Sequence, residues 1–151
     1  MNPRSHTEIE TIIAEAARLP LKDAAFALWR QRWRLATLEG RPTEEEARAY
    51  RASTPEQQAA KLRHDHDYAQ DGPTFGHLKR AHSRADDADI KAAIIAAVKF
   101  DDDCFRFFPD DRTIDYWQRC LFAVAQAQKR SPDYLDSTYQ AARNHVAHQM
   151  K

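Results

Sequence analysis

Apolar residues recur every three or four positions along most of this chain, which is the spacing of residues that share one face of an α-helix. Prolines, glycines and capping residues interrupt the pattern where helices are expected to begin or end. The pattern predicts helices over residues 5–19 and 21–39, two helical pieces within 42–71, a loop over 72–76, a short basic turn over 77–84, and three helices that begin near residues 83, 113 and 131.

The three C-terminal helices have the most regular apolar stripes and are expected to form the best-defined core. The first should begin near a box formed by Ser83 and Asp86, and the other two at Thr113 and Ser131. Ser5 with Glu8 resembles a capping box at the first helix of the chain. The predicted core residues of the three helices are Ile90, Ala93, Ile94, Ala97, Cys104 and Phe105; Ile114, Trp117, Leu121 and Val124; and Tyr134, Leu135, Thr138, Tyr139, Ala142 and Val146.

The segment of residues 42–71 differs from its neighbours because it is mostly polar. Such a segment can bury little apolar surface on folding. We therefore expect a polar helical hairpin that is loosely packed or protrudes, with Thr43 and Thr54 before its two helices. Its large apolar residues are limited to Tyr50, Leu62 and Tyr68.

Composition supports an all-α fold. Alanine, the best helix former, outnumbers valine and isoleucine together by more than two to one. The chain has 3 glycines, and none follows Gly76, so tight β-hairpin turns lack their usual residue. Residues 1–151 are expected to form a single helical bundle of about six or seven helices.

Charge and cysteine usage narrow the function classes. With 23 basic and 23 acidic residues, overall electrostatics give no support to nucleic-acid binding. Cys104 and Cys120 provide neither a disulfide framework nor a zinc set, so we expect reduced core thiols. The first ten residues lack an apolar signal core, and the longest apolar run, 92–98, is too short for a membrane span. The expected location is the cytoplasm, without membrane association.

The predicted helix over residues 21–39 has two apolar faces. One is formed by Phe26, Trp29 and Trp33, and the other by Leu21, Ala24, Leu28, Leu35 and Leu38. A helix that is apolar over so much of its circumference is either central to the bundle or covered by another chain. The face of Phe26, Trp29 and Trp33 predicts a homodimer or a protein partner. Arg30 and Arg34, beside the tryptophans, could bind single-stranded nucleic acid by stacking and charge, although solvated arginines are the simpler interpretation.

The C-terminal sequence contains Arg143-Asn144-His145-Val146-Ala147-His148. An arginine followed after four residues by a histidine, with a polar residue next to the arginine, resembles the signature of HEPN domains, which are small all-α modules that often dimerise. The resemblance covers about the last twenty residues. It implies metal-independent RNA cleavage with Arg143, Asn144 and His148 as catalytic residues.

The implied chemistry suits these side chains. A histidine can move a proton near neutral pH, and an arginine can bind phosphate and stabilise its developing charge. On a straight helix, positions 143 and 148 lie about 140° apart, so they would converge only across a groove or a dimer interface. Chance is an alternative explanation, since arginine and histidine are both frequent here and cations are favoured near helix C-termini.

Metal chemistry has weaker support. His145 and His148 share a helix face, but no further ligands stand at a recognisable spacing, and His64 and His66 point to opposite sides of a helix. The aspartates at 86–89, 101–103 and 110–111 resemble acidic magnesium motifs, although capping explains the first and last groups. Asp101 is the exception, because it continues a core-facing stripe.

These observations leave three functions open. The first is a small helical interaction or regulatory module that self-associates. The second is a HEPN-like ribonuclease or an inactive relative, and the third is a metal-dependent hydrolase. No cofactor is expected, and RNA is a possible partner.

Overall fold

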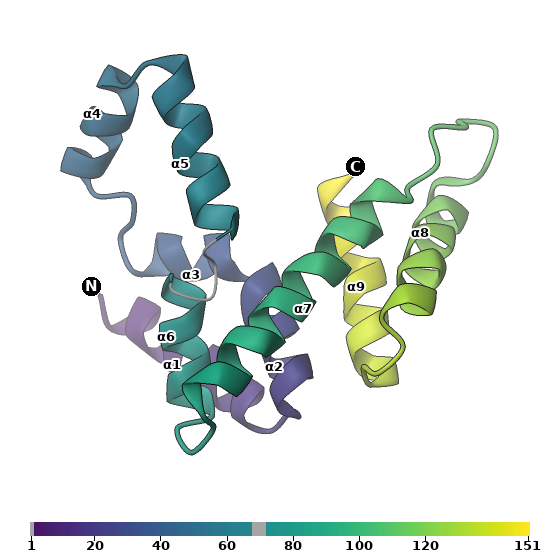
Figure 1. The fold of residues 1–151 in the computed structure, drawn as a ribbon, viewed down its shortest axis with the longest axis horizontal. Helices are drawn as coiled ribbons and strands as arrows, with labels where there is room; N and C mark the ends of the chain where they lie inside the picture. Colours follow the sequence, from purple (N-terminus) through teal and green to yellow (C-terminus); the bar gives the residue numbers. More distant parts are fainter. Residues whose placement is uncertain (1, 68–71) are drawn as a thin grey trace.

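The computed structural model describes residues 2–67 and 72–151, without the side chains of residues 62–67. Its described part is all-α, as predicted, and contains no strand. The described helices are more numerous than the expected six or seven (Figure 1): α1 (Pro3–Ala17), α2 (Leu21–Arg30), α3 (Arg32–Leu38), α4 (Glu44–Ala52), α5 (Pro55–Asp67), α6 (Pro73–Ala81), α7 (Asp87–Arg106), α8 (Tyr116–Arg130) and α9 (Asp136–Gln149).

Two local features account for the larger number of helices. Gln31 leaves the helical conformation, with φ −101° and ψ 10°, and divides the predicted helix over 21–39 into α2 and α3. The predicted loop and basic turn are instead the helix α6, which begins at Pro73 and buries Leu78 against its neighbours. Its apolar stripe is only about two turns long, so the sequence pattern did not reveal it.

The predicted helix starts are right in the polar hairpin. Thr43 Oγ1 accepts a hydrogen bond from the Glu46 N–H at 3.1 Å, and α4 follows it. Thr54 and Gln57 exchange hydrogen bonds between side chain and backbone at 2.9 and 3.1 Å, which forms a capping box before α5.

Three other predicted starts are wrong, because different residues supply the caps. Asn2 Oδ1, rather than Ser5, caps α1 by accepting from the Ser5 N–H at 2.8 Å. Asp115 caps α8, so that helix begins after Thr113. α9 begins at Asp136, whereas residues 131–135 form turns.

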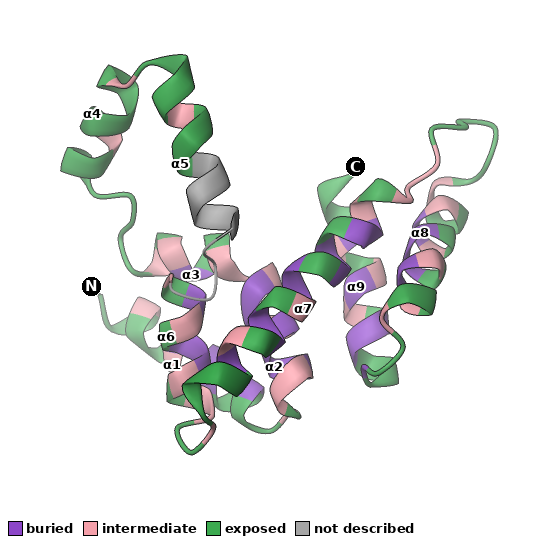
Figure 2. Ribbon diagram, viewed as in Figure 1, coloured by how far each residue is buried: buried purple, intermediate pink, exposed green. Residues whose placement is uncertain are grey.

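The core lies between α2 and α7, which pack against each other at the centre of the molecule. α1 and α6 contact this pair on one side, and α8 and α9 contact α7 on the other (Figures 1 and 2). A cluster of aromatic rings connects α2, α7 and α9. Its members are Phe26 of α2, Phe100 of α7, Tyr134 and Tyr139.

The buried face of α8 agrees with the prediction at Val124 and differs from it at the other three positions. Ile114 and Trp117 are exposed, and Leu121 is only partly buried. Small residues let α8 approach its neighbours closely, whereas the larger side chains point outward. The core residues of α8 are Cys120, Ala123, Val124 and Ala127. Leu135, also predicted to be buried, is exposed just before α9.

Helices α4 and α5 project from the rest of the molecule as a hairpin (Figure 1). α4 buries none of its residues, and Tyr50 is 40% exposed. The predicted apolar positions Leu62 and Tyr68 lie outside the described side chains.

None of the helices in the described ranges has the length and apolar character of a membrane span.

Candidate functional site

Asp101 is a buried carboxylate in the third quarter of α7, where that helix faces α2 and α9. Its burial confirms that this acid occupies a core-facing position. The Trp29 indole N–H donates to Oδ2 at 3.2 Å, and His145 Nε2 lies 3.4 Å from Oδ1. Within the described chain, Oδ1 has no hydrogen bond besides this ion-pair contact. A buried carboxylate needs such partners, because transfer of a charge out of water is costly.

His145 is held between Asp101 and an aromatic ring. The centre of its imidazole lies 5.6 Å from that of the Phe105 ring, in an edge-on arrangement. The imidazole therefore contacts both a buried carboxylate and an aromatic ring. The sequence motif drew attention to His148, so the placement of His145 was not anticipated.

Arg32 extends this cluster to the surface. Its guanidinium lies 3.8 Å from the centre of the Trp29 ring and 5.3 Å from that of Trp33, and it donates to the Trp29 carbonyl oxygen at 2.9 Å. Burial lowers the pKa of Arg32, and the charges of Asp101 and Asp102 oppose this shift. The spacing of three residues between Trp29 and Arg32 could have indicated this contact. The sequence pattern instead indicated Arg30 and Arg34.

The predicted apolar face of Phe26, Trp29 and Trp33 is not a single exposed surface. Phe26 and Trp29 are 1% and 5% exposed and belong to the core, whereas Trp33 is 67% exposed. The interruption at Gln31 explains the difference, because Trp33 lies in α3 and the other two residues lie in α2. An interface through Phe26 and Trp29 is therefore wrong, and only Trp33 is available to a partner.

Arg30 and Arg34 each lie near a glutamate of α1. Arg34 contacts Glu8 Oε1 through Nη2 at 2.5 Å and through Nε at 2.9 Å. Burial lowers the pKa of Arg30, and the charge of Glu15 opposes that shift. These acids weaken the attraction of either arginine for phosphate groups.

The motif residues lie on the outer part of α9. Arg143 is partly buried and donates to Gln140 Oε1 at 3.2 Å, and Asn144 Oδ1 accepts from Gln140 Nε2 at 3.3 Å. His148 is exposed in the last turn. With about 140° between positions 143 and 148, the helix directs these two side chains to different sides.

Two of the remaining aspartates, Asp103 and Asp111, have structural partners, whereas Asp86 is the N-cap residue of α7 without a side-chain capping hydrogen bond. Asp103 is buried, and it contacts Arg130 at 3.0 Å and Arg106 at 3.3 Å. Asp111 is exposed, and hydrogen bonds from the Thr113 side chain and backbone lower its pKa. Among the described residues, no group of three histidine, cysteine, aspartate or glutamate side chains could hold a metal ion. His64 and His66 lie outside the described side chains.

Both cysteines are buried free thiols, in agreement with their predicted place in the core. Burial is the main cause that raises the pKa of Cys104 and Cys120 above the ordinary value of a thiol. The thiolate is the nucleophilic form of cysteine. Neither residue is therefore suited to nucleophilic catalysis at neutral pH.

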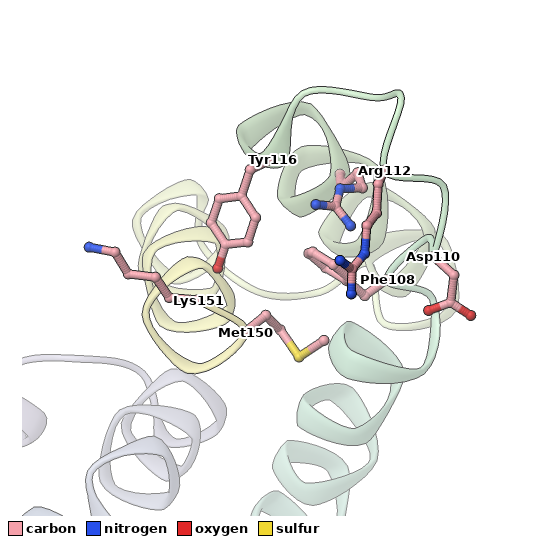
Figure 3. Close-up of a pocket in the computed structure, with 7 residues that line it drawn as sticks. Phe108, Asp110, Arg112, Tyr116, Met150 and Lys151 are labelled. Carbon is pink, nitrogen blue, oxygen red and sulfur yellow. The ribbon is translucent and has the colours of Figure 1, made fainter.

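A cavity of about 500 Å³ lies where α7 and α9 end and α8 begins (Figure 3). Its apolar walls are Phe108, Tyr116 and Met150. Arg112, Arg119, Lys151 and Asp110 supply its charged groups. This cavity shares no residue with the cluster around Asp101. Of its lining residues, only Asp110 was considered in the sequence analysis, as part of an acidic motif.

Comparison with known proteins gives no further identification: no family model, curated protein or solved structure matches this chain significantly. Function must therefore be inferred from the arrangement of side chains. The two features that carry chemistry are the cluster of Asp101, His145, Trp29 and Arg32, with exposed Trp33 at its edge, and the cationic cavity at the end of α9.

Proposed function

We propose that this protein is a small helical interaction module that self-associates through a surface formed by α1 and α3. The observation that carries this proposal is Trp33, a large apolar side chain that is 67% exposed in a well-formed helix. Aromatic residues are enriched at protein interfaces relative to the rest of the surface. Tryptophan and arginine are also the residues most enriched among those that dominate binding energy.

Trp33 has a cationic neighbour on the surface. The Arg32 guanidinium lies 5.3 Å from the centre of its ring. Arg32 is itself fixed by its stacking on the buried Trp29 ring. Contacts that exist before binding reduce the conformational entropy lost when a partner binds.

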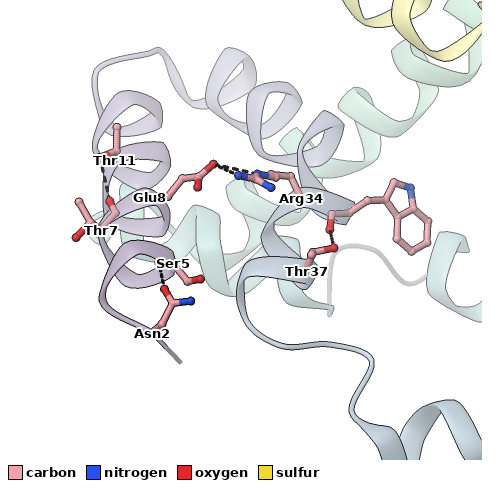
Figure 4. Close-up of polar contacts among 8 residues, drawn as sticks. Asn2, Ser5, Thr7, Glu8, Thr11, Arg34 and Thr37 are labelled. Carbon is pink, nitrogen blue, oxygen red and sulfur yellow. Dashed lines mark hydrogen bonds and ion pairs between the residues drawn. The ribbon is translucent and has the colours of Figure 1, made fainter.

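The charges around Trp33 fit a second copy of the chain. Figure 4 shows the Glu8–Arg34 pair that joins α1 to α3 near this position. In a two-fold interface the same patch lies on both sides, so a surface with both signs can pair with itself. The formal net charge of zero also removes long-range repulsion between copies.

Sedimentation equilibrium over the micromolar range tests this proposal, with a concentration-dependent dimer as the expected result. The Trp33→Ala variant should weaken the dimer by about 2 kcal/mol or more, roughly thirtyfold in Kd. Trp117→Ala is the matched control, because Trp117 is also exposed, at 38%, but lies on α8. A protein that stays monomeric, or dimers that are equally sensitive to both substitutions, would contradict the proposal.

A second candidate is the metal-independent RNA cleavage that the resemblance to HEPN domains implies. The observation that favours it is that His148 of the motif is exposed on α9, where a substrate could reach it. An imidazole can transfer protons in such a cleavage, although one copy of the chain does not bring Arg143 and His148 together. His145, next to the buried Asp101, is a second imidazole on the same helix.

Cleavage of single-stranded RNA in the presence of EDTA tests this second candidate. If Arg143 and His148 are catalytic, their alanine variants should each lose about 10²–10⁴-fold in rate, with the helical circular dichroism unchanged. His145→Ala should then have a smaller effect. Activity that depends on His145 but not on His148 would contradict the implied roles and assign proton transfer to the Asp101–His145 pair. If the wild-type protein does not cleave RNA, the ribonuclease candidate is wrong and the interaction module remains as the proposed function.

A further inference from the structure

The cavity at the end of α9 has the features of a binding site, independently of self-association. Its volume of about 500 Å³ lies in the range of small-molecule sites. The Phe108 and Tyr116 rings form two of its walls, with centres 5.9 Å apart. Met150 adds a flexible apolar side chain (Figure 3). Such walls favour a flat apolar group over a fully hydrated ligand.

Arg119 is the central charged group of the cavity. Its guanidinium lies 5.0 Å from the centre of the Phe108 ring and 5.7 Å from that of Tyr116, and it donates to the Pro109 carbonyl oxygen at 3.3 Å. Its Nε atom is buried and has no hydrogen-bond partner in the described parts of the chain. A buried donor without an acceptor is costly. The same side chain also lines the cavity, so an anion there would interact with the part of the guanidinium that faces it.

The position of Arg119 does not favour the stability of α8. Arg119 lies in the first turn of α8, where the helix dipole disfavours a cation, and the nearest acid on that helix is the N-cap residue Asp115. Arg112 and Lys151 add two further cations, against the carboxylate of Asp110 in the lining and that of Asp111, which interacts with Arg119. In Figure 3, Arg112 lies near Phe108, whereas Lys151 extends from the rim. The cavity is thus positively charged beside aromatic walls.

We propose that this cavity binds a small anion that carries a planar ring, of the mononucleotide class. The ring would stack against Phe108 and Tyr116, and the phosphate would accept hydrogen bonds from Arg112 and Arg119. Stacking on aromatic side chains combined with cationic contacts to phosphate is the common means of binding single nucleotides in a strand. Arginine suits this role because its planar donors match phosphate oxygens.

Isothermal titration calorimetry of the full chain with AMP, adenosine and inorganic phosphate tests the proposal. AMP is expected to bind, with adenosine and phosphate each weaker by about tenfold or more, because each retains only one type of contact. Arg119→Ala and Arg112→Ala should each weaken AMP binding by about tenfold. Lys129→Ala is the matched control, because this exposed cation lies at the other end of α8 and should leave binding unchanged.

Two variants keep the test decisive if Arg119→Ala disturbs folding. Arg112 is exposed, so its substitution leaves the core intact, and Phe108→Leu removes the ring while it retains an apolar side chain. No AMP binding at millimolar concentration, or equal binding by wild type and the Arg112 variant, would overturn the proposal. Phosphate that binds as tightly as AMP would overturn the role of the ring. The Trp33→Ala variant should still bind AMP, so the outcome is separate from that of self-association.

Discussion

Replacement of Phe100 by alanine is expected to destabilise the protein by about 3–5 kcal/mol. Phe100 is completely buried, at 0% exposure. Its ring centre lies 5.0 Å from that of Phe26, 4.9 Å from Tyr134 and 5.6 Å from Tyr139. It therefore joins α2 and α9 to α7, and its removal would leave a cavity that several fixed helices cannot close.

Denaturation in urea would measure this loss, which is a large part of the roughly 5–15 kcal/mol that stabilises a typical domain. Phe122→Ala is the matched control, because Phe122 is 50% exposed on α8 and should cost less than about 1 kcal/mol. A loss below about 1 kcal/mol for Phe100→Ala would show that the aromatic cluster does not hold the three helices together.

Replacement of Asp23 by alanine is expected to cost about 3 kcal/mol or more. Asp23 is 2% exposed in α2, and its Oδ1 atom accepts from the Leu135 N–H at 2.8 Å and from the Thr138 hydroxyl at 2.6 Å. These donors belong to the start of α9, and Leu135 at the N-cap provides no side-chain hydrogen bond of its own. Hydrogen bonds to a charged acceptor contribute about 1.5–3 kcal/mol each, and an unpaired buried donor is costly.

Thermal and urea denaturation would measure this effect, and the Asp23→Asn variant separates its two causes. Asparagine keeps an acceptor oxygen but loses the negative charge that favours a helix N-terminus, so an intermediate loss is expected. Asp133→Ala is the matched control, because the Asp133 side chain is 79% exposed and lies 3.9 Å from Lys22. It should change stability by less than about 1 kcal/mol. Equal losses for Asp23→Ala and Asp133→Ala would show that the cap contributes nothing specific.

Periodicity predicted the fold class and most helices, because burial of one face is a local property of the sequence. Periodicity failed where the apolar stripe of a helix was short, or where the buried face of a helix consisted of small residues. α6 has an apolar stripe of about two turns, and α8 buries Cys120 and alanines while Trp117 is exposed. Helix starts were misplaced where Asn2 or Asp115, rather than a nearby serine or threonine, supplied the cap.

The candidate site was predictable only in part. Asp101 could be singled out, because it continues an apolar stripe and so had to be buried. Its contact with His145 could not be inferred, since α7 and α9 are brought together by tertiary packing. The separation of Trp29 from Trp33 depends on Gln31, which carries no helix-breaking signal in the sequence. Arg32 was missed although it stands three residues after Trp29, because the sequence does not show which arginine near the tryptophans lies on a buried ring.

The cap on α9 connects residues 112 positions apart in the chain. At a translation rate of roughly 5–20 residues per second, Leu135 is synthesised about 6–22 s after Asp23. Nascent α2 lacks α7 until residue 106 has been made, and it lacks α9 for the whole of that interval. The native packing of α2 is therefore completed only after the start of α9 has been synthesised, and until then its apolar side lacks part of its cover.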